Sequence, residues 1–185
     1  TKHGITDKRV GLEKSFVPID SAEILQKCCP NNLFVDALPL LEELRAVKSS
    51  QELAILRSAS DLVVQSMLAV FEKHGPGSTK AQLTESLRQE EVKRGMTFEY
   101  CLITTGKSHN RSPSNQKWED GQILSLDSGG NYKGYIGDLC RMAVHGRPSQ
   151  ELESALDQID SVQKAARKPI KSGITGAEIY ESAMS

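Results

Sequence analysis

The sequence predicts an α+β fold, in which amphipathic helices pack against an antiparallel sheet. Apolar residues recur at helical spacing over residues 49–74 and again after residue 149. Residues 96–106 change to aromatic and β-branched side chains, which favours a strand, and residues 122–146 have the pattern of a two-armed hairpin. The composition agrees, because 38% of the 185 residues are hydrophobic and 25% are charged, as in an ordinary globular protein.

The charge balance argues against nucleic acid or an anionic membrane as the main partner. Lys and Arg number 23 and Asp and Glu number 24, so the net charge is −1. No apolar run approaches the ~20 residues of a membrane span, and no secretory signal is visible. None of the four cysteines (Cys28, Cys29, Cys101 and Cys140) forms a C-x-x-C pair. We expect reduced thiols in a cytoplasmic protein rather than a disulfide or zinc role.

The first 48 residues predict short elements. Residues 9–18 have strand-like spacing, and a short helix is expected from near Asp20 to Pro30. Residues 33–49 follow, with Pro39 near the start of a helical turn. The chain begins with Thr1 rather than Met, which predicts that it is processed, trimmed or cut from something longer.

Two long helices come next. The first begins at the capping-box pair Ser49 and Glu52 and ends at the Gly-Pro-Gly segment 75–77. The second begins at Thr79 and Gln82, which have the same capping spacing. Their apolar stripes predict core packing against the strands that follow.

Part of this pattern occurs twice. Residues 77–86 and 173–182 both read Gly-x-Thr-x-x-(Gln/Glu)-(Leu/Ile)-x-Glu-Ser, and each follows a helix. The helix before the second copy starts near Ser149, and Pro169 kinks or ends it. The second copy stops at Ser185, before any strand. We therefore expect that the chain ends inside a two-fold repeated domain.

Two aspartates flank the glycine-rich turn of the hairpin. A turn centred between Tyr132 and Lys133 would place Asp127 directly opposite Asp138, with both carboxylates on one face. Facing like charges cost about 0.2–1 kcal/mol or more when desolvated. A shared proton, a cation such as Lys133 or Arg141, or a bound divalent metal would compensate. Alternatively, the turn lies elsewhere or the aspartates are merely exposed, and the spacing by itself leaves these readings open.

The residues around the aspartates carry a resemblance. The segment "QILSLDSGGNYKGYIGDLCRMAVHGRPSQEL" resembles the hairpin of the pita-bread metallopeptidases, the family of Xaa-Pro aminopeptidases, Xaa-Pro dipeptidases, methionine aminopeptidase and creatinase. The matching positions are Asp127, Gly129, Gly134, Tyr135, Asp138, Arg141, Gly146, Pro148 and Ser149. Residues 44–60 also resemble the stretch that joins the N-terminal domain of creatinase and Xaa-Pro peptidases to their catalytic domain.

The resemblance implies a pita-bread fold, a curved antiparallel sheet with helices on its outer face, incomplete in this chain. Residues 1–48 would be the end of a creatinase-type N-terminal domain and its linker. Residues 49–185 would be the first part of the catalytic domain. Members of this type are often homodimers, which we expect of the intact protein.

The resemblance also implies a dinuclear metal site. Asp127 would chelate one divalent ion and Asp138 would bridge two, with manganese, cobalt, zinc or iron as the metal. The ions would activate a hydroxide to hydrolyse a short peptide substrate near its N-terminus. The family completes its site with a later histidine and two glutamates, which neither His145 nor Glu178 is placed to supply. The chain therefore supplies two of five ligands, and we expect it to be inactive alone.

One departure concerns substrate binding. The family's substrate-binding histidine falls on Asn110 when counted back from Gly121, and its neighbour His109 serves only after a one-residue shift. Two alternatives remain: creatinase-like C–N hydrolysis, and a non-catalytic pita-bread protein that binds other molecules. The paired aspartates Asp127 and Asp138 favour the peptidase over both.

Overall fold

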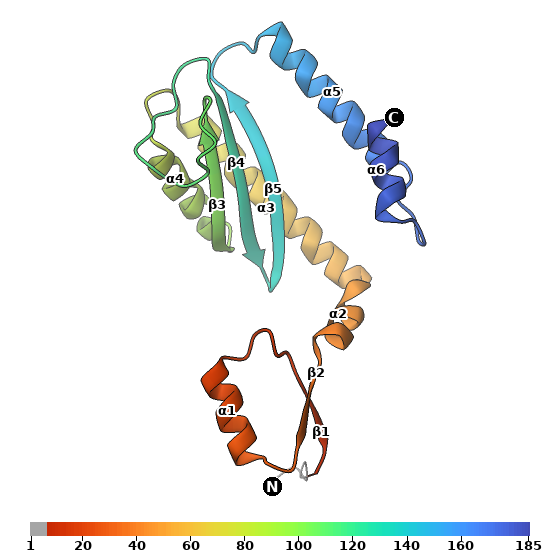
Figure 1. The fold of residues 1–185 in the computed structure, drawn as a ribbon. Helices are drawn as coiled ribbons and strands as arrows, with labels where there is room; N and C mark the ends of the chain where they lie inside the picture. The colour runs from red at the N-terminus through yellow and green to blue at the C-terminus, as the bar shows by residue number, and fades with distance from the viewer. Residues whose placement is uncertain (1–6) are drawn as a thin grey trace. The chain divides into compact units, whose positions relative to one another are not determined.

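The computed structural model describes residues 7–185 (Figure 1). The chain divides into two compact units, with the division between Ala54 and Ile55. The first unit contains β1 (Arg9–Leu12), α1 (Ile19–Cys28), β2 (Leu33–Asp36) and α2 (Leu38–Ala46). Strands β1 and β2 pair in parallel, and α1 forms the connection between them. The predicted strand over residues 9–18 is shorter than expected, because a turn follows β1, with the Lys14 amide donating to the Leu12 carbonyl at 3.0 Å.

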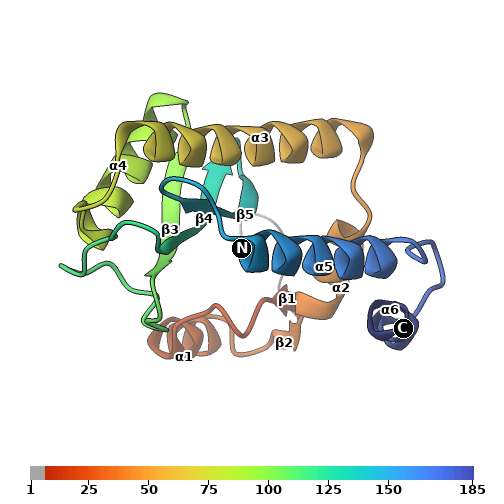
Figure 2. The same cartoon turned by 90° about the horizontal axis from the view of Figure 1, so that it is seen from above.

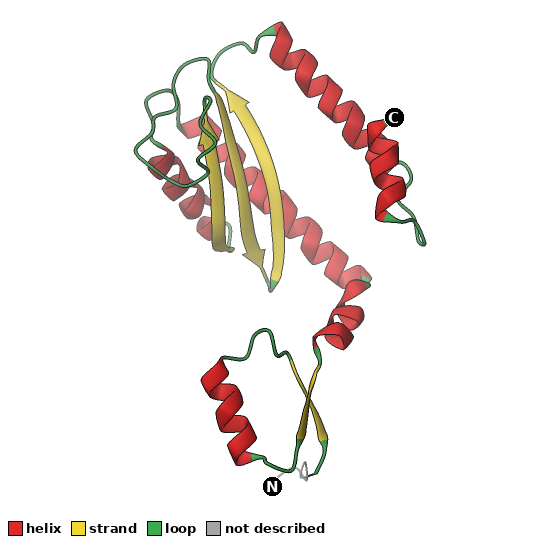
Figure 3. Ribbon diagram, in the orientation of Figure 1, coloured by secondary structure: helices red, strands yellow, loops and turns green. Residues whose placement is uncertain are grey.

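The second unit carries the sheet and the long helices. Its elements are α3 (Ser50–Lys73, which begins in the first unit), α4 (Lys80–Lys93), β3 (Thr97–Thr105), β4 (Ile123–Tyr132), β5 (Tyr135–Val144), α5 (Gln150–Arg167) and α6 (Gly176–Met184). The three strands form an antiparallel sheet in the order β3-β4-β5 (Figure 3). The predicted α+β class is therefore confirmed.

Helices α3 and α4 cover one face of this sheet (Figure 2). The apolar stripe of α3 enters a single buried cluster with α4 and the strands. Its members are Val63, Met67, Val70, Leu83, Leu87, Met96, Cys101, Ile103, Trp118, Leu124 and Leu126. This cluster faces away from Asp127 and Asp138, because neighbouring residues of a strand point to opposite faces. The other face of the sheet carries Asp127 and Asp138, and side chains of α5 lie beside it near Met142. It is called the open face from here on.

Helix α3 is also long and apolar enough to cross a membrane by length and composition, with a mean hydropathy of 1.4 over its best window. The sequence showed no uninterrupted apolar run of this length, because charged residues such as Arg57 and Asp61 lie within the helix. These few charges lower the mean hydropathy of the window only slightly. A buried core helix passes the same test, and α3 packs its apolar stripe into the cluster.

Helix α3 approaches the hairpin closely at a pair of glycines. Gly130 and Gly137 are register partners on β4 and β5. A Cβ added at Gly137 would lie 2.6 Å from the backbone carbonyl of Ala59, and one at Gly130 would lie 3.0 Å from the Val63 side chain. The absence of side chains at these two positions lets α3 rest directly on the hairpin.

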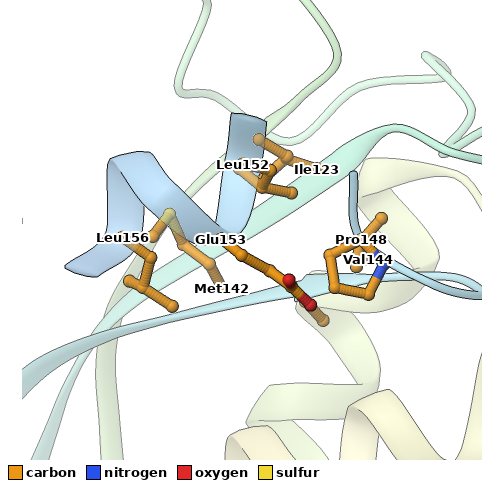
Figure 4. A pocket seen from close by; sticks show the side chains of 8 residues that line it. Ile123, Met142, Val144, Pro148, Leu152, Glu153 and Leu156 are labelled. Carbon is orange, nitrogen blue, oxygen red and sulfur yellow. The ribbon is translucent and has the colours of Figure 1, made fainter. Parts of the chain in front are cut away.

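The repeated sequence pattern forms the same local structure twice. Thr79 starts α4 and Thr175 starts α6, each with a reciprocal capping box. Helix α5 begins at its Ser149 cap and ends at Arg167, before Pro169. Near the end of the hairpin, side chains of β5 and α5 line a shallow apolar pocket that includes Met142 and Leu156 (Figure 4).

Candidate metal centre

The hairpin register places the two aspartates on the same face, but not directly opposite each other. Asp127 pairs with Cys140, and Asp138 pairs with Gly129. The predicted direct opposition is therefore wrong by two residues, and the carboxylates are diagonal neighbours across β4 and β5. A shift by two residues preserves the face, since side chains alternate with a period of two.

The position of the turn causes this shift. Tyr132 and Tyr135 are the last register partners, so the turn residues are Lys133 and Gly134. Both have positive φ, 54° and 86°, which fits a tight two-residue hairpin turn that follows the twist of the strands. The Asn131 side chain stabilises the turn by accepting a hydrogen bond from the Gly134 amide at 2.9 Å.

Asp127 forms an ion pair with Arg111. The guanidinium Nη2 of Arg111 donates to Oδ2 of Asp127. The sequence suggested Lys133 or Arg141 as the compensating cation, and this was wrong for Asp127. Lys133 lies over the Tyr132 ring at 5.1 Å, and Arg141 donates to the Cys140 carbonyl at 2.7 Å.

Asp138 accepts a hydrogen bond from Tyr100, which reaches it from two strands away. Tyr100 and Asp138 are both register partners of Gly129, one on each side of it. A Cβ at Gly129 would lie 2.3 Å from the Tyr100 ring, so glycine leaves the space in which the ring lies across β4. The hydrogen bond to Asp138, with burial and the charges of both aspartates, raises the pKa of Tyr100 to about 12.

The two candidate substrate-binding residues lie on the loop between β3 and β4. His109 is exposed. Asn110 is also exposed, and its side-chain oxygen accepts a hydrogen bond from the Ser112 amide at 2.9 Å, so it supports the loop locally. Whether either residue contacts substrate stays a prediction.

The centre has the donor chemistry for a divalent cation but an incomplete ligand set. Two carboxylates on one sheet face suit hard divalent ions. Among residues 7–185, no group of three or more His, Cys, Asp or Glu comes together in a way that could hold a metal. His145 pairs instead with Asp120, at 2.7 Å, and Glu178 completes the α6 capping box. Asp127 and Asp138 thus fit as part of a metal site.

Sequence reasoning missed Tyr100 and Arg111. Their contacts depend on the sheet register and on the path of the loop, and no short motif marks either residue. The bulge between Phe98 and Tyr100 sets which β3 residue faces Asp138.

Comparison with known proteins identifies the family. Residues 54–185 match the model of metallopeptidase family M24. The chain belongs to this family. The match contains the whole hairpin and both aspartates.

Individual relatives agree with this assignment. The chain is 27% identical over 164 residues to an Xaa-Pro aminopeptidase of Escherichia coli, covering 82% of this chain and 37% of the relative. It is 24% identical over 177 residues to an Xaa-Pro dipeptidase of Pyrococcus horikoshii, covering 93% and 50%. The crystal structure of X-Pro aminopeptidase from Thermotoga maritima superposes with a TM-score of 0.86 at 21% identity, covering 95% and 51%. The chain has the pita-bread fold, and it spans about half the length, or less, of these relatives.

Proposed function

We propose that the intact protein is a metal-dependent peptidase of the Xaa-Pro type, which cleaves short peptides near their N-terminus. The observation that best supports this proposal is the placement of Asp127 and Asp138 as diagonal neighbours on one sheet face, within the residues that match the M24 family. Both side chains are accessible on the open face, with Asp127 23% exposed.

In this proposal, Asp127 and Asp138 would hold two divalent ions, Asp127 as a chelating ligand and Asp138 as a shared one, with manganese, cobalt, zinc or iron as the metal. When bound, such ions supply Lewis-acid activation of water and of the scissile carbonyl. Tyr100 orients Asp138 by donating a hydrogen bond to its carboxylate. His109 or Asn110, on the loop that also carries Arg111, contacts the peptide. The resemblance to the family, rather than any contact in the structure, supports this last assignment.

Metal binding by the 185-residue chain tests the site directly. We expect weak Mn²⁺ binding, which is measured as the loss of the free-ion EPR signal. The affinity for Mn²⁺ should be lower still in both D127N and D138N. The exposed Asp61 on α3 provides a matched control, because D61N removes the same charge from a helix on the opposite face of the sheet. Equal Mn²⁺ affinity in D127N, D138N and the unmodified chain would refute the site.

We also propose that the chain is inactive by itself, because two carboxylates hold a transition metal weakly and leave the ligand set incomplete. Incubation of the pure chain with an Xaa-Pro dipeptide and Mn²⁺ should release no free proline above the rate of the D127N variant. Metal-dependent release above that rate would contradict this proposal.

A non-catalytic binding protein is the second candidate. The observation that favours it concerns Asn110, which occupies the position where the family has its substrate-binding histidine. The Asn110 side-chain oxygen accepts a hydrogen bond from the Ser112 amide. Substitution of Asn110 by His in the intact protein distinguishes the two. A peptidase that depends on imidazole should gain activity in N110H, whereas a protein that binds without cleaving should show no turnover in either form. Creatinase-like C–N hydrolysis would appear as turnover of creatine in place of peptide.

The remaining proposals concern the whole protein. We propose that it is a cytoplasmic homodimer without a nucleic-acid or membrane partner, and that residues 1–48 belong to an N-terminal domain that precedes the catalytic one. Light scattering coupled to size-exclusion chromatography measures the oligomeric state, and a mass corresponding to a single subunit would contradict the dimer.

A further inference from the structure

The open face carries a cation of its own at Asp127. The Arg111 guanidinium donates to Oδ2 of Asp127, so one of the two carboxylate oxygens that a metal would use is already engaged. The Arg111 side chain is 55% exposed, and that of Asp127 is 23% exposed. The ion pair therefore lies at the boundary with solvent, where the free energy gained from such a pair is small.

The backbone that carries Arg111 is held in place. The Arg111 carbonyl accepts a hydrogen bond from the Ile103 amide at 2.8 Å, which fixes the loop along β3. One residue earlier, the Asn110 carbonyl accepts a hydrogen bond from Nζ of Lys80. Together these bonds anchor two successive carbonyl groups of the loop, those of Asn110 and Arg111.

Lys80 is an unusual anchor. Its side chain is completely buried, and this burial lowers its pKa. A buried ammonium group is costly unless its hydrogen bonds are made, so its presence indicates that the loop contact matters to the fold. Consequently the Arg111 backbone cannot drift away from the strand, whereas its long and half-exposed side chain can rotate.

We propose that Arg111 is a built-in competitor of the divalent cation at Asp127. Without metal, the guanidinium neutralises Asp127. When a cation binds Asp127 and Asp138, the Arg111 side chain rotates off the carboxylate while its backbone stays anchored. Because the two cations exclude each other, Arg111 sets the metal concentration at which the site fills. This inference rests on the proposed metal site.

The test compares Mn²⁺ affinity in the R111Q variant and the unmodified chain, with the free-ion EPR signal as the readout. We expect binding up to about fivefold tighter in R111Q, because the metal has to displace only a solvent-exposed ion pair. R111K keeps the charge but loses the planar guanidinium, so its affinity should lie between the two. R141Q is the matched control, because Arg141 lies on the neighbouring strand and donates to the Cys140 carbonyl.

A second variant tests the anchor. K80M removes the bond to the Asn110 carbonyl, so the loop should loosen and Mn²⁺ should bind more tightly than in the unmodified chain, towards the affinity of R111Q. Far-UV circular dichroism and a urea midpoint establish that K80M is folded. Because K80M acts only through Arg111 in this scheme, the double variant K80M/R111Q should bind Mn²⁺ no more tightly than R111Q.

The outcomes separate the inference from the proposed function. Tighter binding in R111Q with no change in R141Q supports the competitor role. Equal affinity in R111Q and the unmodified chain, with loss in D127N, overturns the competitor role and leaves the metal site standing. An equal gain in Mn²⁺ affinity in R111Q and R141Q also overturns the competitor role, since the loss of any nearby positive charge would then explain the gain. No binding in either the unmodified chain or R111Q would overturn both the metal site and the inference.

Discussion

Tyr100 and Asp138 lie on strands that do not pair with each other, yet the phenol of one donates a hydrogen bond to the carboxylate of the other. Gly129 lies between them and is the register partner of both. The contact fixes the orientation of a proposed metal ligand from outside the hairpin. It also makes the stability of the sheet depend on the protonation of Tyr100.

The first prediction concerns high pH. The folded pKa of Tyr100 is raised to about 12 from an ordinary value of 10.0. A raised pKa contributes stability that is fully present below pH 10 and is lost as the pH rises towards 12. We expect the urea midpoint of the unmodified chain to fall across this interval and that of Y100F to fall less. Absorbance at 295 nm should lose its component near pH 12 in Y100F and keep it in Y180F.

The second prediction concerns a buried carboxyl group beneath the sheet. The Ser128 hydroxyl lies 2.8 Å from both Oε1 of Glu91 and the Tyr100 carbonyl. The hydroxyl donates to both acceptors and shares its one proton between them. Burial raises the pKa of Glu91, and the hydrogen bond from Ser128 opposes this shift only in part. Within residues 7–185, Oε2 of Glu91 has no hydrogen-bond partner. Burying an oxygen without a partner costs less free energy in a neutral carboxyl group than in an ionised one.

The pKa of Glu91 is raised in the folded chain. The contribution of Glu91 to the free energy of unfolding is therefore fully present below the ordinary pKa of 4.5, and it is lost as the pH rises through the folded pKa. The glutamine of E91Q stays neutral at every pH. The free energy of unfolding of E91Q should therefore fall less than that of the unmodified chain as the pH rises above the folded pKa of Glu91. At pH 8 we expect E91Q to be more stable than the unmodified chain by about 1–3 kcal/mol in urea unfolding. E85Q is an exposed control on the same helix. Lower stability of E91Q at every pH would show that Glu91 is ionised and paired.

The third prediction concerns the glycine pair under α3. A methyl group at Gly137 would lie 2.6 Å from the Ala59 carbonyl, and backbone atoms cannot yield as a flexible side chain can. We expect G137A to destabilise the chain by about 2–4 kcal/mol, measured by chemical denaturation. G176A is the control, because nothing lies within 4 Å of a Cβ at Gly176, and it should change stability little. Similar denaturation midpoints for the two variants would mean that α3 does not rest on the hairpin.

The fourth prediction concerns thiol reactivity. Cys101 is buried in the core, and this burial raises its pKa to about 12, whereas Cys28 and Cys140 are exposed. A disulfide reagent at pH 8 should modify Cys28 and Cys140 quickly and Cys101 only after unfolding, because the thiolate is the reactive form. Peptide mapping after modification identifies the sites. Fast labelling of Cys101 in the folded chain would contradict the packing of β3.

The hairpin illustrates what the sequence could and could not predict. Alternation along the arms predicted correctly that Asp127 and Asp138 share a face. The exact register could not be predicted, because it depends on which residues take positive φ, and Lys133 at 54° is not a residue type that favours it. The prediction of a common face still holds, since a shift of the register by two residues leaves each side chain on the same face.

The helix starts were predictable for a different reason. A capping box is a local device, so Thr79 and Gln82 carry the signal by themselves. The partners of the aspartates are not local. Arg111 reaches Asp127 across β3 because its loop is anchored by Lys80, and Tyr100 reaches Asp138 because Gly129 has no side chain. Such contacts require the assembled sheet.

The open face of the sheet has a consequence for how the chain behaves in concentrated solution. Alternation along β5 places Ile136 and Met142, 42% and 57% exposed, on the same face as Asp138. Exposed apolar strands attract one another, and charged side chains among them oppose stacking of two copies. The carboxylate of Asp138 therefore opposes the stacking of two such sheets, whereas the charge of Asp127 is already paired with Arg111. Neutralising Asp138 should lower the solubility of the chain well before it lowers the stability of the fold.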